Sequence, residues 1–267
     1  HYLKRTFFII LVFFSLCTFS QKDTIINFYN FNNQKFLSKP NDLKFIEVLI
    51  KKNDTLWKFE RYKANGHLFC YWHSKTKDSQ QKIGQFVTFD RNDSISSVTY
   101  YNQKGLRSGR VKAWFPNRNV NYEGSYKNGK RNGVWKFFHF NGKIAARGFF
   151  KNDTLIKQFY FDEFGKSIKV KEDCCTREQR FKGGINKFRN KLKKFTKTIN
   201  YKLIGDLYVD FSIDINGNID DVEIYGYAPN NVKQELITFF KNIKGWEPAI
   251  HLNRKVPSNY FIKLNFK

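Results

Sequence analysis

The feature that most constrains the fold is a repeat of about 24 residues in the first two thirds of the chain. An earlier unit begins at Gly84, 25 residues before Gly109. The segment KNDTL occurs twice, from Lys52 and from Lys151, so its two copies are about four such steps apart. A period of this length is typical of an array of small identical units. When residues 109–132 are aligned with 133–155, the matching pairs are Gly109/Gly133, Val111/Trp135, Trp114/Phe138, Gly124/Gly148, Tyr126/Phe150 and Asn128/Asn152.

Each unit has the pattern of a β-hairpin. The stretch GVWKFFHFNGKIAARGFFKND contains an aromatic strand, the turn Asn141-Gly142, a second strand and a polar turn. Asn-Gly supplies the positive φ angles of a two-residue hairpin turn. A single hairpin is marginally stable in water, so successive hairpins must pair side by side to cover their aromatic faces. We therefore expect one elongated antiparallel sheet of repeated hairpins, in a protein that is mainly β.

The residues EGSYKNGKRNGVWKFFHFNGK in this region resemble the MORN-type repeat, in the variant found in bacterial exported proteins. The resemblance covers about residues 54–168 and is best in the two central units. It implies a scaffold or an interaction surface. It carries no catalytic chemistry with it.

The last third of the chain has a different periodicity. Apolar residues alternate in steps of three and four from Ile185 to Ile199, which predicts an amphipathic helix. Leu207, Val209, Phe211 and Ile213 then alternate with polar residues, which predicts a strand with one solvent-exposed face. Asn216-Gly217 predicts a two-residue turn into a second strand.

A second helix and a final strand complete this part. Asn231 is a candidate cap, and the predicted buried stripe is Val232, Leu236, Phe239 and Ile243. At the end of the chain Tyr260, Ile262, Leu264 and Phe266 alternate with Phe261, Lys263 and Asn265. The expected fold class is therefore mainly β plus α+β, with helices packed on a three-stranded antiparallel sheet after the hairpin array.

The order of four motifs resembles the C-terminal domain of TonB energy transducers. They are FKGG with Gly183 and Gly184, GDLYVDFSIDINGNIDDVEI, GWEPA with Trp246 and Pro248, and the terminal Y-x-I-x-L-x-F. The resemblance implies that an extended peptide, such as that of an outer-membrane TonB-dependent receptor, pairs with an exposed sheet edge. The implied partner-binding edge is Tyr260, Phe261, Ile262, Lys263, Leu264, Asn265 and Phe266.

The first residues predict export. Lys4 and Arg5 precede an apolar run over residues 7–14, and small or polar residues end at Ser20. We predict a signal peptide at 1–20, a repeat domain at 21–168, a linker at 169–180 and a TonB-like domain at 181–267. This organisation places the protein in the periplasm or cell envelope of a Gram-negative bacterium. Retention of the first segment as an inner-membrane anchor is the alternative.

The formal net charge of +25 suggests anionic partners. The basic residues are spread along the chain instead of forming one footprint, so no nucleic-acid partner is expected. A local basic face lies on the first predicted helix, with Lys187, Arg189 and Lys191 among its residues. Peripheral contact with anionic envelope surfaces is therefore an alternative function.

No enzyme activity is expected, since no nucleophile, base and orienting group occur at a recognisable spacing. No cofactor and no metal is expected either. His67 and His73 share one face of a predicted strand while Cys70 points to the other. The sequence thus predicts a non-catalytic exported protein that binds a protein or peptide. A TonB-type energy transducer is the second reading, although the chain has only 5 Pro and no Pro-rich linker.

Overall fold

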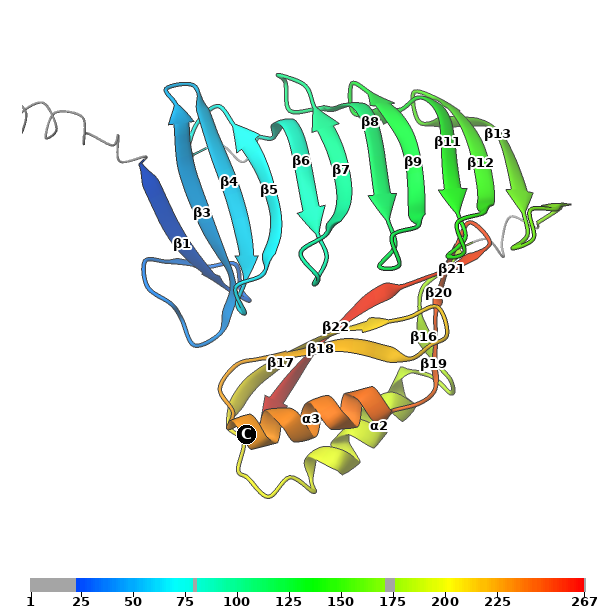
Figure 1. Ribbon diagram of the computed structural model, residues 1–267. Coiled ribbons are helices and arrows are strands. Elements are labelled where there is room, and N and C mark those ends of the chain that lie inside the picture. Colours follow the sequence, from blue (N-terminus) through cyan, green and yellow to red (C-terminus); the bar gives the residue numbers. More distant parts are fainter. Residues whose placement is uncertain (1–22, 79–80, 171–175, 267) are drawn as a thin grey trace, which may run out of the picture.

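The computed structural model describes residues 23–78, 81–170 and 176–266. It confirms the predicted fold class. A long antiparallel sheet of successive hairpins is followed by two helices on a three-stranded antiparallel sheet (Figure 1). The predicted signal peptide and the Cys174-Cys175 pair lie outside the described residues.

The long sheet has fourteen strands, and those from β3 to β14 follow one another in chain order, apart from β10, which pairs only with β9. The period predicted from the sequence is visible in the strand positions, since β9 begins at Val120 and β12 at Ile144, 24 residues later. The strands are β1 (Thr24–Asn30), β2 (Lys35–Phe36), β3 (Leu43–Asn53), β4 (Leu56–Lys63), β5 (Leu68–Ser74), β6 (Ile83–Phe89), β7 (Ile95–Tyr101), β8 (Arg107–Trp114), β9 (Val120–Lys127), β10 (Lys130–Arg131), β11 (Gly133–Phe138), β12 (Ile144–Lys151), β13 (Thr154–Phe161) and β14 (Ser167–Ile168).

Large aromatic side chains cover one another along one face of this sheet. Phe59 and Trp72 are fully buried and stack with ring centroids 5.0 Å apart. Further along the sheet, Trp135 lies across the backbone of Gly124, where an added Cβ would be 2.3 Å from the indole. Gly148 is the equivalent position one period later, and its Cβ would meet Phe150 at 2.7 Å. The repeated glycine therefore leaves room for an aromatic ring.

The hairpin turns differ from the two-residue turns that Asn-Gly predicts. Between β11 and β12, the N–H of His139 donates to the carbonyl of Lys143 at 2.8 Å, and Gly142 donates back to His139 at 2.9 Å. This leaves three loop residues, with Gly142 at φ 87°. The turn after β17 has the same form, with Asp214 bonded to Asn218. A third loop residue in the left-handed region gives the hairpin a bulge that matches the strand twist.

The two KNDTL copies form turns at different registers. The first pairs Asn53 with Leu56, whereas the second pairs Lys151 with Thr154. In the second copy the Asp153 carboxylate accepts a hydrogen bond from the N–H of Arg131, in β10, at 2.8 Å. The two copies therefore differ in register although their five residues are identical, and a contact with the neighbouring unit distinguishes the second copy.

The C-terminal part contains two helices, α2 (Ile185–Thr196) and α3 (Asn230–Asn242). They pack on a sheet of order β18–β17–β22, with β17 (Gly205–Ile213), β18 (Ile219–Tyr225) and β22 (Ser258–Phe266). The short strands are β15 (Thr176–Arg177), β16 (Arg180–Phe181), β19 (Trp246–Glu247), β20 (Ala249–His251) and β21 (Arg254–Val256). Of these, β15 falls in the predicted linker and β16 begins at its last residue, and both pair with strands of the C-terminal part.

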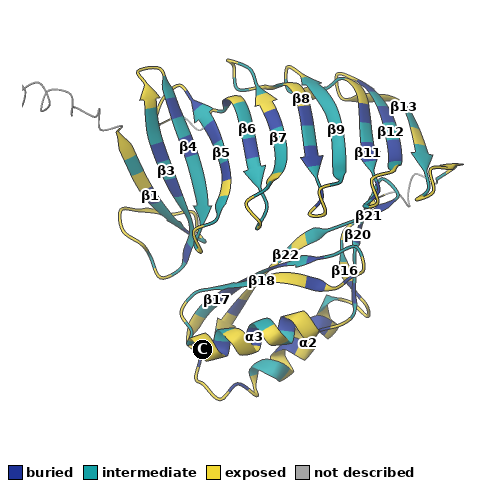
Figure 2. Cartoon of the chain, viewed as in Figure 1, coloured by how far each residue is buried: buried dark blue, intermediate teal, exposed yellow. Residues whose placement is uncertain are grey.

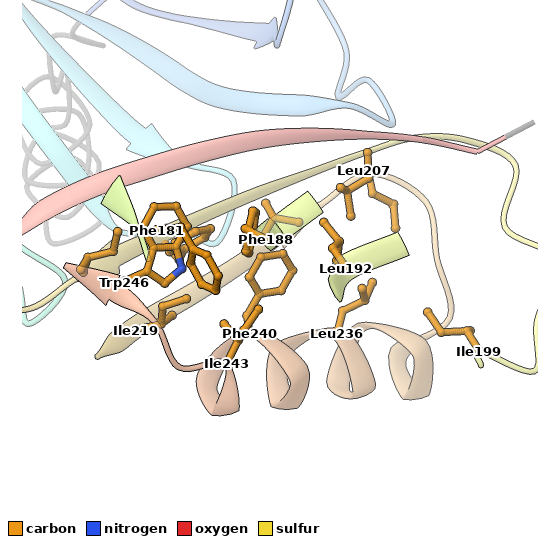
Figure 3. Packing of buried hydrophobic residues seen from close by; sticks show 14 of the residues in the cluster. Phe181, Phe188, Leu192, Ile199, Leu207, Ile219, Leu236, Phe240, Ile243 and Trp246 are labelled. Carbon is orange, nitrogen blue, oxygen red and sulfur yellow. The ribbon is translucent and has the colours of Figure 1, made fainter. Parts of the chain in front are cut away.

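One continuous core joins helices and sheet, with Phe188, Phe240 and Trp246 at its centre (Figure 3). The stripe predicted for α3 is wrong at one position, because Phe240 is buried and Phe239 is only half-buried. Phe239 instead stacks on Phe195 of α2 at 4.3 Å and fills the space between the helices. The helix also starts earlier than predicted, with Pro229 and not Asn231 at the N-cap.

The face of β17 predicted to be solvent-exposed is covered. Tyr208 is 6% exposed, and Phe31, in the loop after β1, stacks on its ring at a centroid distance of 4.1 Å. The turns at one end of the hairpin array therefore lie on the outer face of the small sheet (Figures 1 and 2). The polar side of β17 therefore faces the docked long sheet at Tyr208 and Asp210 instead of open solvent.

We expect Gly124→Ala to destabilise the protein by about 1–3 kcal/mol, because the Trp135 ring must move out of a filled site. Urea denaturation followed by tryptophan fluorescence measures this change. Ser108→Ala, in the adjacent strand, is the matched control and should shift the free energy of unfolding by less than about 0.5 kcal/mol. Equal effects of the two substitutions would contradict the close packing at Gly124.

Candidate functional site

The strand β22 lies at one edge of the small sheet. It pairs with β17 along its full nine residues, from Ser258 opposite Ile213 to Phe266 opposite Gly205. No other strand in the described ranges pairs with its second edge. A long unpaired edge presents a row of backbone donors and acceptors to another chain.

The two faces of β22 have different surroundings. Tyr260, Ile262, Leu264 and Phe266 pack into the core beneath the helices, as the sequence alternation predicts. On the other face the ring of Phe261 is 50% exposed, and it lies 5.5 Å from Phe31. A strand added at this edge would therefore meet apolar side chains on both of its faces.

The charged and amide groups on the exposed face of β22 are already paired. The Lys263 ammonium and the Asn265 amide both donate to the Asp206 carboxylate, each at 2.7 Å. These hydrogen bonds, that of Lys263 first, hold the pKa of Asp206 below its usual value. Phe261 is therefore the apolar side chain that remains available on this face.

The first residues of β22 are partly covered. The Gln179 amide donates to the carbonyl of Asn259 at 3.3 Å. Gln179 belongs to the segment between β15 and β16, which runs past the beginning of the strand. The part of the edge that remains accessible therefore starts at Tyr260, the first residue of the edge predicted from the sequence.

The structure brings most of the predicted motif residues to the start of that edge. A hollow of about 610 Å³ is lined by Gly183, Gly184, Trp246 and Tyr260, together with basic residues of β16 and α2. Gly183 and Gly184 have φ of 83° and 86°, which turns the chain into α2. Pro248 is not part of this hollow and lies between β19 and β20, where the chain changes from one small sheet to another.

Trp246 has a structural role. Its ring is 5% exposed and lies 4.9 Å from that of Tyr260. Its backbone carbonyl approaches Gly217 so closely that a Cβ there would be 2.1 Å away. Trp246 thus fixes the β17–β18 turn and the first accessible residue of β22 relative to each other.

Two basic residues at one end of the long sheet, one at the end of β4 and one in the turn after β6, reach the outer face of the small sheet. Lys63 lies 3.0 Å from Glu223 and 3.7 Å from Asp210, and Arg91 lies 3.2 Å from Asp221. Burial raises the pKa of Asp210, and the nearby Lys63 only partly opposes it. Burial also acts to raise the pKa of Glu223, but the hydrogen bond from Tyr225 and the charge of Lys63 outweigh it, so that pKa is lowered.

Sequence reasoning missed the hairpin β20–β21. Its turn is formed by Leu252 and Asn253, at φ 50° and 63°, and contains no glycine. Leu252 packs against the aromatic cluster of the long sheet, and Arg254 enters the same region. The Asn at the second turn position is the one local signal that could have indicated this hairpin.

His67, Cys70 and His73, the candidate metal ligands in the sequence, are not grouped into a metal site among the described residues. Cys70 is buried, and this burial raises the pKa of its thiol to about 11, which makes it unreactive at neutral pH. Within residues 23–78, 81–170 and 176–266, no group of three His, Cys, Asp or Glu is placed to hold a metal ion. In the same ranges no helix has both the length and the apolar character needed to span a membrane.

Comparison with known proteins adds no relative. No protein-family model matches the chain, and no curated protein matches it. The resemblances to the MORN-type repeat and to the TonB C-terminal domain therefore depend on the motifs themselves and stay predictions.

Lys63→Met should lower the free energy of unfolding by about 1–3 kcal/mol, since it leaves two half-buried carboxylates with less compensation. Chemical denaturation measures the loss. Lys136→Met is the matched control, because it breaks an ion pair with Glu123 that is more exposed. The Lys136 and Glu123 side chains are 40% and 34% exposed, whereas those of Lys63 and Glu223 are 22% and 16% exposed. This control should cost less than about 1 kcal/mol. A control loss as large as that of Lys63→Met would refute the importance of the contact between the two parts.

Proposed function

We propose that this protein is a non-catalytic, exported protein of the cell envelope that binds an extended segment of a partner protein by strand addition to β22. The observation that carries the proposal is the unpaired outer edge of this strand among the described residues. Main-chain hydrogen bonds along the edge supply affinity, and side-chain contacts on the two faces supply preference.

The opposite edge of the small sheet, formed by β18, is less suited to pairing. The β17–β18 ladder is interrupted between Asp210 and Ser212, and Asp221 has φ 51°. A bulge of this kind bends a strand away from regular pairing. Asp221 and Glu223 are also held by Arg91. The longer and uninterrupted ladder of β22 therefore favours that edge.

The hollow beside Tyr260 supports recognition of a side chain as well as of backbone. It lies where the accessible edge begins, and its walls combine the rings of Phe181, Trp246 and Tyr260 with the basic Arg180, Lys182 and Arg189. Its single acidic residue, Glu247, is paired with Arg180 at 2.7 Å. A partner residue with an apolar body and an acidic end suits these walls.

The resemblance to the TonB C-terminal domain makes an outer-membrane TonB-dependent receptor the candidate partner. A role as an energy transducer is the alternative within the same class. It depends on retention of the N-terminal segment, which lies outside the described residues. In either role the partner segment would pair with the outer edge of β22.

Hydrogen exchange tests strand addition directly. In the free protein, the amides of Tyr260–Phe266 that point away from β17 should exchange quickly while alternate ones are protected. A saturating peptide from the periplasmic segment of such a receptor should slow the fast set at least about tenfold. The amides of β18 are the internal control and should not change.

Phe261→Ala should weaken binding of the same peptide about threefold to tenfold, since it removes an exposed apolar contact on the pairing strand. Phe164→Ala is the matched control, because this ring is 85% exposed at the far end of the long sheet. Protection that appears on β18, or binding that leaves all exchange rates of β22 unchanged, would refute the proposal.

A second candidate function has its own observation. The basic residues of α2, including Lys187, Arg189 and Lys193, are exposed. Figure 2 shows exposed positions along this helix. An exposed cationic helix face attracts anionic lipid or polysaccharide. This attraction would place the protein at an envelope surface beside its partner.

Replacing Lys187, Lys193 and Lys194 together with glutamine should weaken binding to vesicles containing phosphatidylglycerol at least about tenfold, because each lysine contributes on the order of 1 kcal/mol at such a surface. A vesicle co-sedimentation assay at low and high salt measures this. The same exchange at Lys35, Lys104 and Lys130, all exposed on the long sheet, is the matched control. Equal losses from both triple variants would show that net charge alone acts.

A further inference from the structure

A second hollow, away from the β22 edge, lies between the long sheet and the hairpin β20–β21. It has a volume of about 630 Å³. Tyr122, Tyr126, Trp135 and Phe150 form its walls on the sheet side, and Arg254 belongs to the wall on the hairpin side. Figure 1 shows β20 and β21 reaching the end of β11 at this place. Both parts of the chain are needed to form it.

Arg254 is the unusual residue of this hollow, because it is a buried cation without a counter-ion. It is 3% exposed. Its Nη1 donates to the carbonyls of Asn121 and Phe138, at 3.0 and 2.6 Å, and to the Asn121 side-chain oxygen at 2.7 Å. All three acceptors are neutral, and no carboxylate of the described chain pairs with it. Burial lowers the pKa of Arg254 to about 10, so the group is still charged at neutral pH.

One edge of this guanidinium has no partner. Nε is buried without a hydrogen bond, and the bonds made by Arg254 all come from Nη1, which leaves Nη2 unbonded among the described residues. Nε and Nη2 form the side edge of the planar fork. That edge binds a carboxylate with two parallel hydrogen bonds. An unsatisfied buried donor is costly, so a ligand that satisfies it gains affinity. Because Nε has almost no accessible surface in the free protein, the side chains around it must shift for this second hydrogen bond to form.

The rest of the hollow suits a ring that carries the acid group. The rings of Tyr126 and Trp135 meet edge to face at 5.0 Å and present aromatic surface to it. Arg131 and His251 are further lining residues, and none of the described lining residues is acidic. Flat rings of aromatic acids and of acidic sugars both pack on such surfaces.

We propose that this hollow binds a small organic acid in which a carboxylate is attached to a six-membered ring, with Arg254 holding the carboxylate and Trp135 and Tyr126 contacting the ring. The site is independent of strand addition at β22. It lies where the two parts of the chain meet, so its occupant would stabilise their contact.

Isothermal titration calorimetry on the full chain tests the site with four probes. Benzoate and glucuronate represent the aromatic acid and the acidic sugar, and benzamide and glucose are their uncharged counterparts. We expect one or both acids to bind, each at least about tenfold more tightly than its neutral counterpart. The acid that binds more tightly shows whether the site prefers an aromatic acid or an acidic sugar.

Arg254→Lys keeps the charge but removes the planar guanidinium, and it should weaken binding of the acid at least about tenfold. Because this substitution also alters the contact between the two parts, Gln158→Glu provides a second variant. Gln158 lines the hollow, so a negative charge there should weaken binding of the acid several-fold without removing any core side chain. Gln103→Glu, on an exposed turn, is the matched control and should leave binding unchanged.

Three results would each overturn the proposal. They are no binding of either acid, equal binding of an acid and its neutral counterpart, and equal effects of Gln158→Glu and Gln103→Glu. Loss of strand addition at β22 with acid binding intact would leave this site standing, so the two proposals fail separately.

Discussion

Each hairpin of the long sheet depends on its neighbours, and this constraint governs the rest of the molecule. A hairpin can pair its own two strands but cannot cover its own aromatic face or satisfy its outer backbone groups. Trp135 illustrates the dependence, since its indole lies across Gly124 of the neighbouring strand and donates to the carbonyl of Ser125 at 3.2 Å. The sheet is therefore stable as an array, and its turns form two regular rows along its ends.

One of these rows is the platform for the C-terminal part. Phe31, Lys63 and Arg91 lie in or beside turns of that row and contact one face of the small sheet. The hairpin β20–β21 makes a second contact further along, where Leu252 enters the aromatic cluster. Two separated contacts fix the orientation of the small sheet more firmly than one would. The face of β17 is occupied by this docking, which leaves the outer edge of β22 as the accessible pairing surface.

The two proposed sites use opposite means of recognition. The β22 edge offers backbone groups and exposed apolar side chains such as Phe261, which suit an extended peptide. The hollow at Arg254 offers a desolvated charge among rings, which suits a small rigid anion. The first site is formed mainly by the C-terminal part, with Phe31 of the long sheet beside Phe261. The second exists only while the two parts are docked, so an anion bound there would favour the arrangement in which β22 is presented.

The sequence by itself determined the long elements of this protein, although not the short strands such as β20 and β21. The 24-residue spacing of glycine and aromatic residues predicted the hairpin array, and the alternation from Leu207 to Ile213 predicted β17, because both patterns report local geometry and burial. The last strand and its two faces were also predictable. The turn form was not, since Asn-Gly occurs in three-residue loops as well as in two-residue ones.

Only the tertiary structure decided what covers each face. Tyr208 and Asp210 have the alternation of a solvent-exposed face, yet Phe31 and Lys63, some 150 residues or more away in the chain, lie against them. Arg254 carries no local signal at all, because its partners Asn121 and Phe138 come from other strands. Sequence periodicity shows that a side chain is buried or paired within its own element. It holds no information about which distant surface supplies the contact, since that depends on the packing of complete sheets against each other.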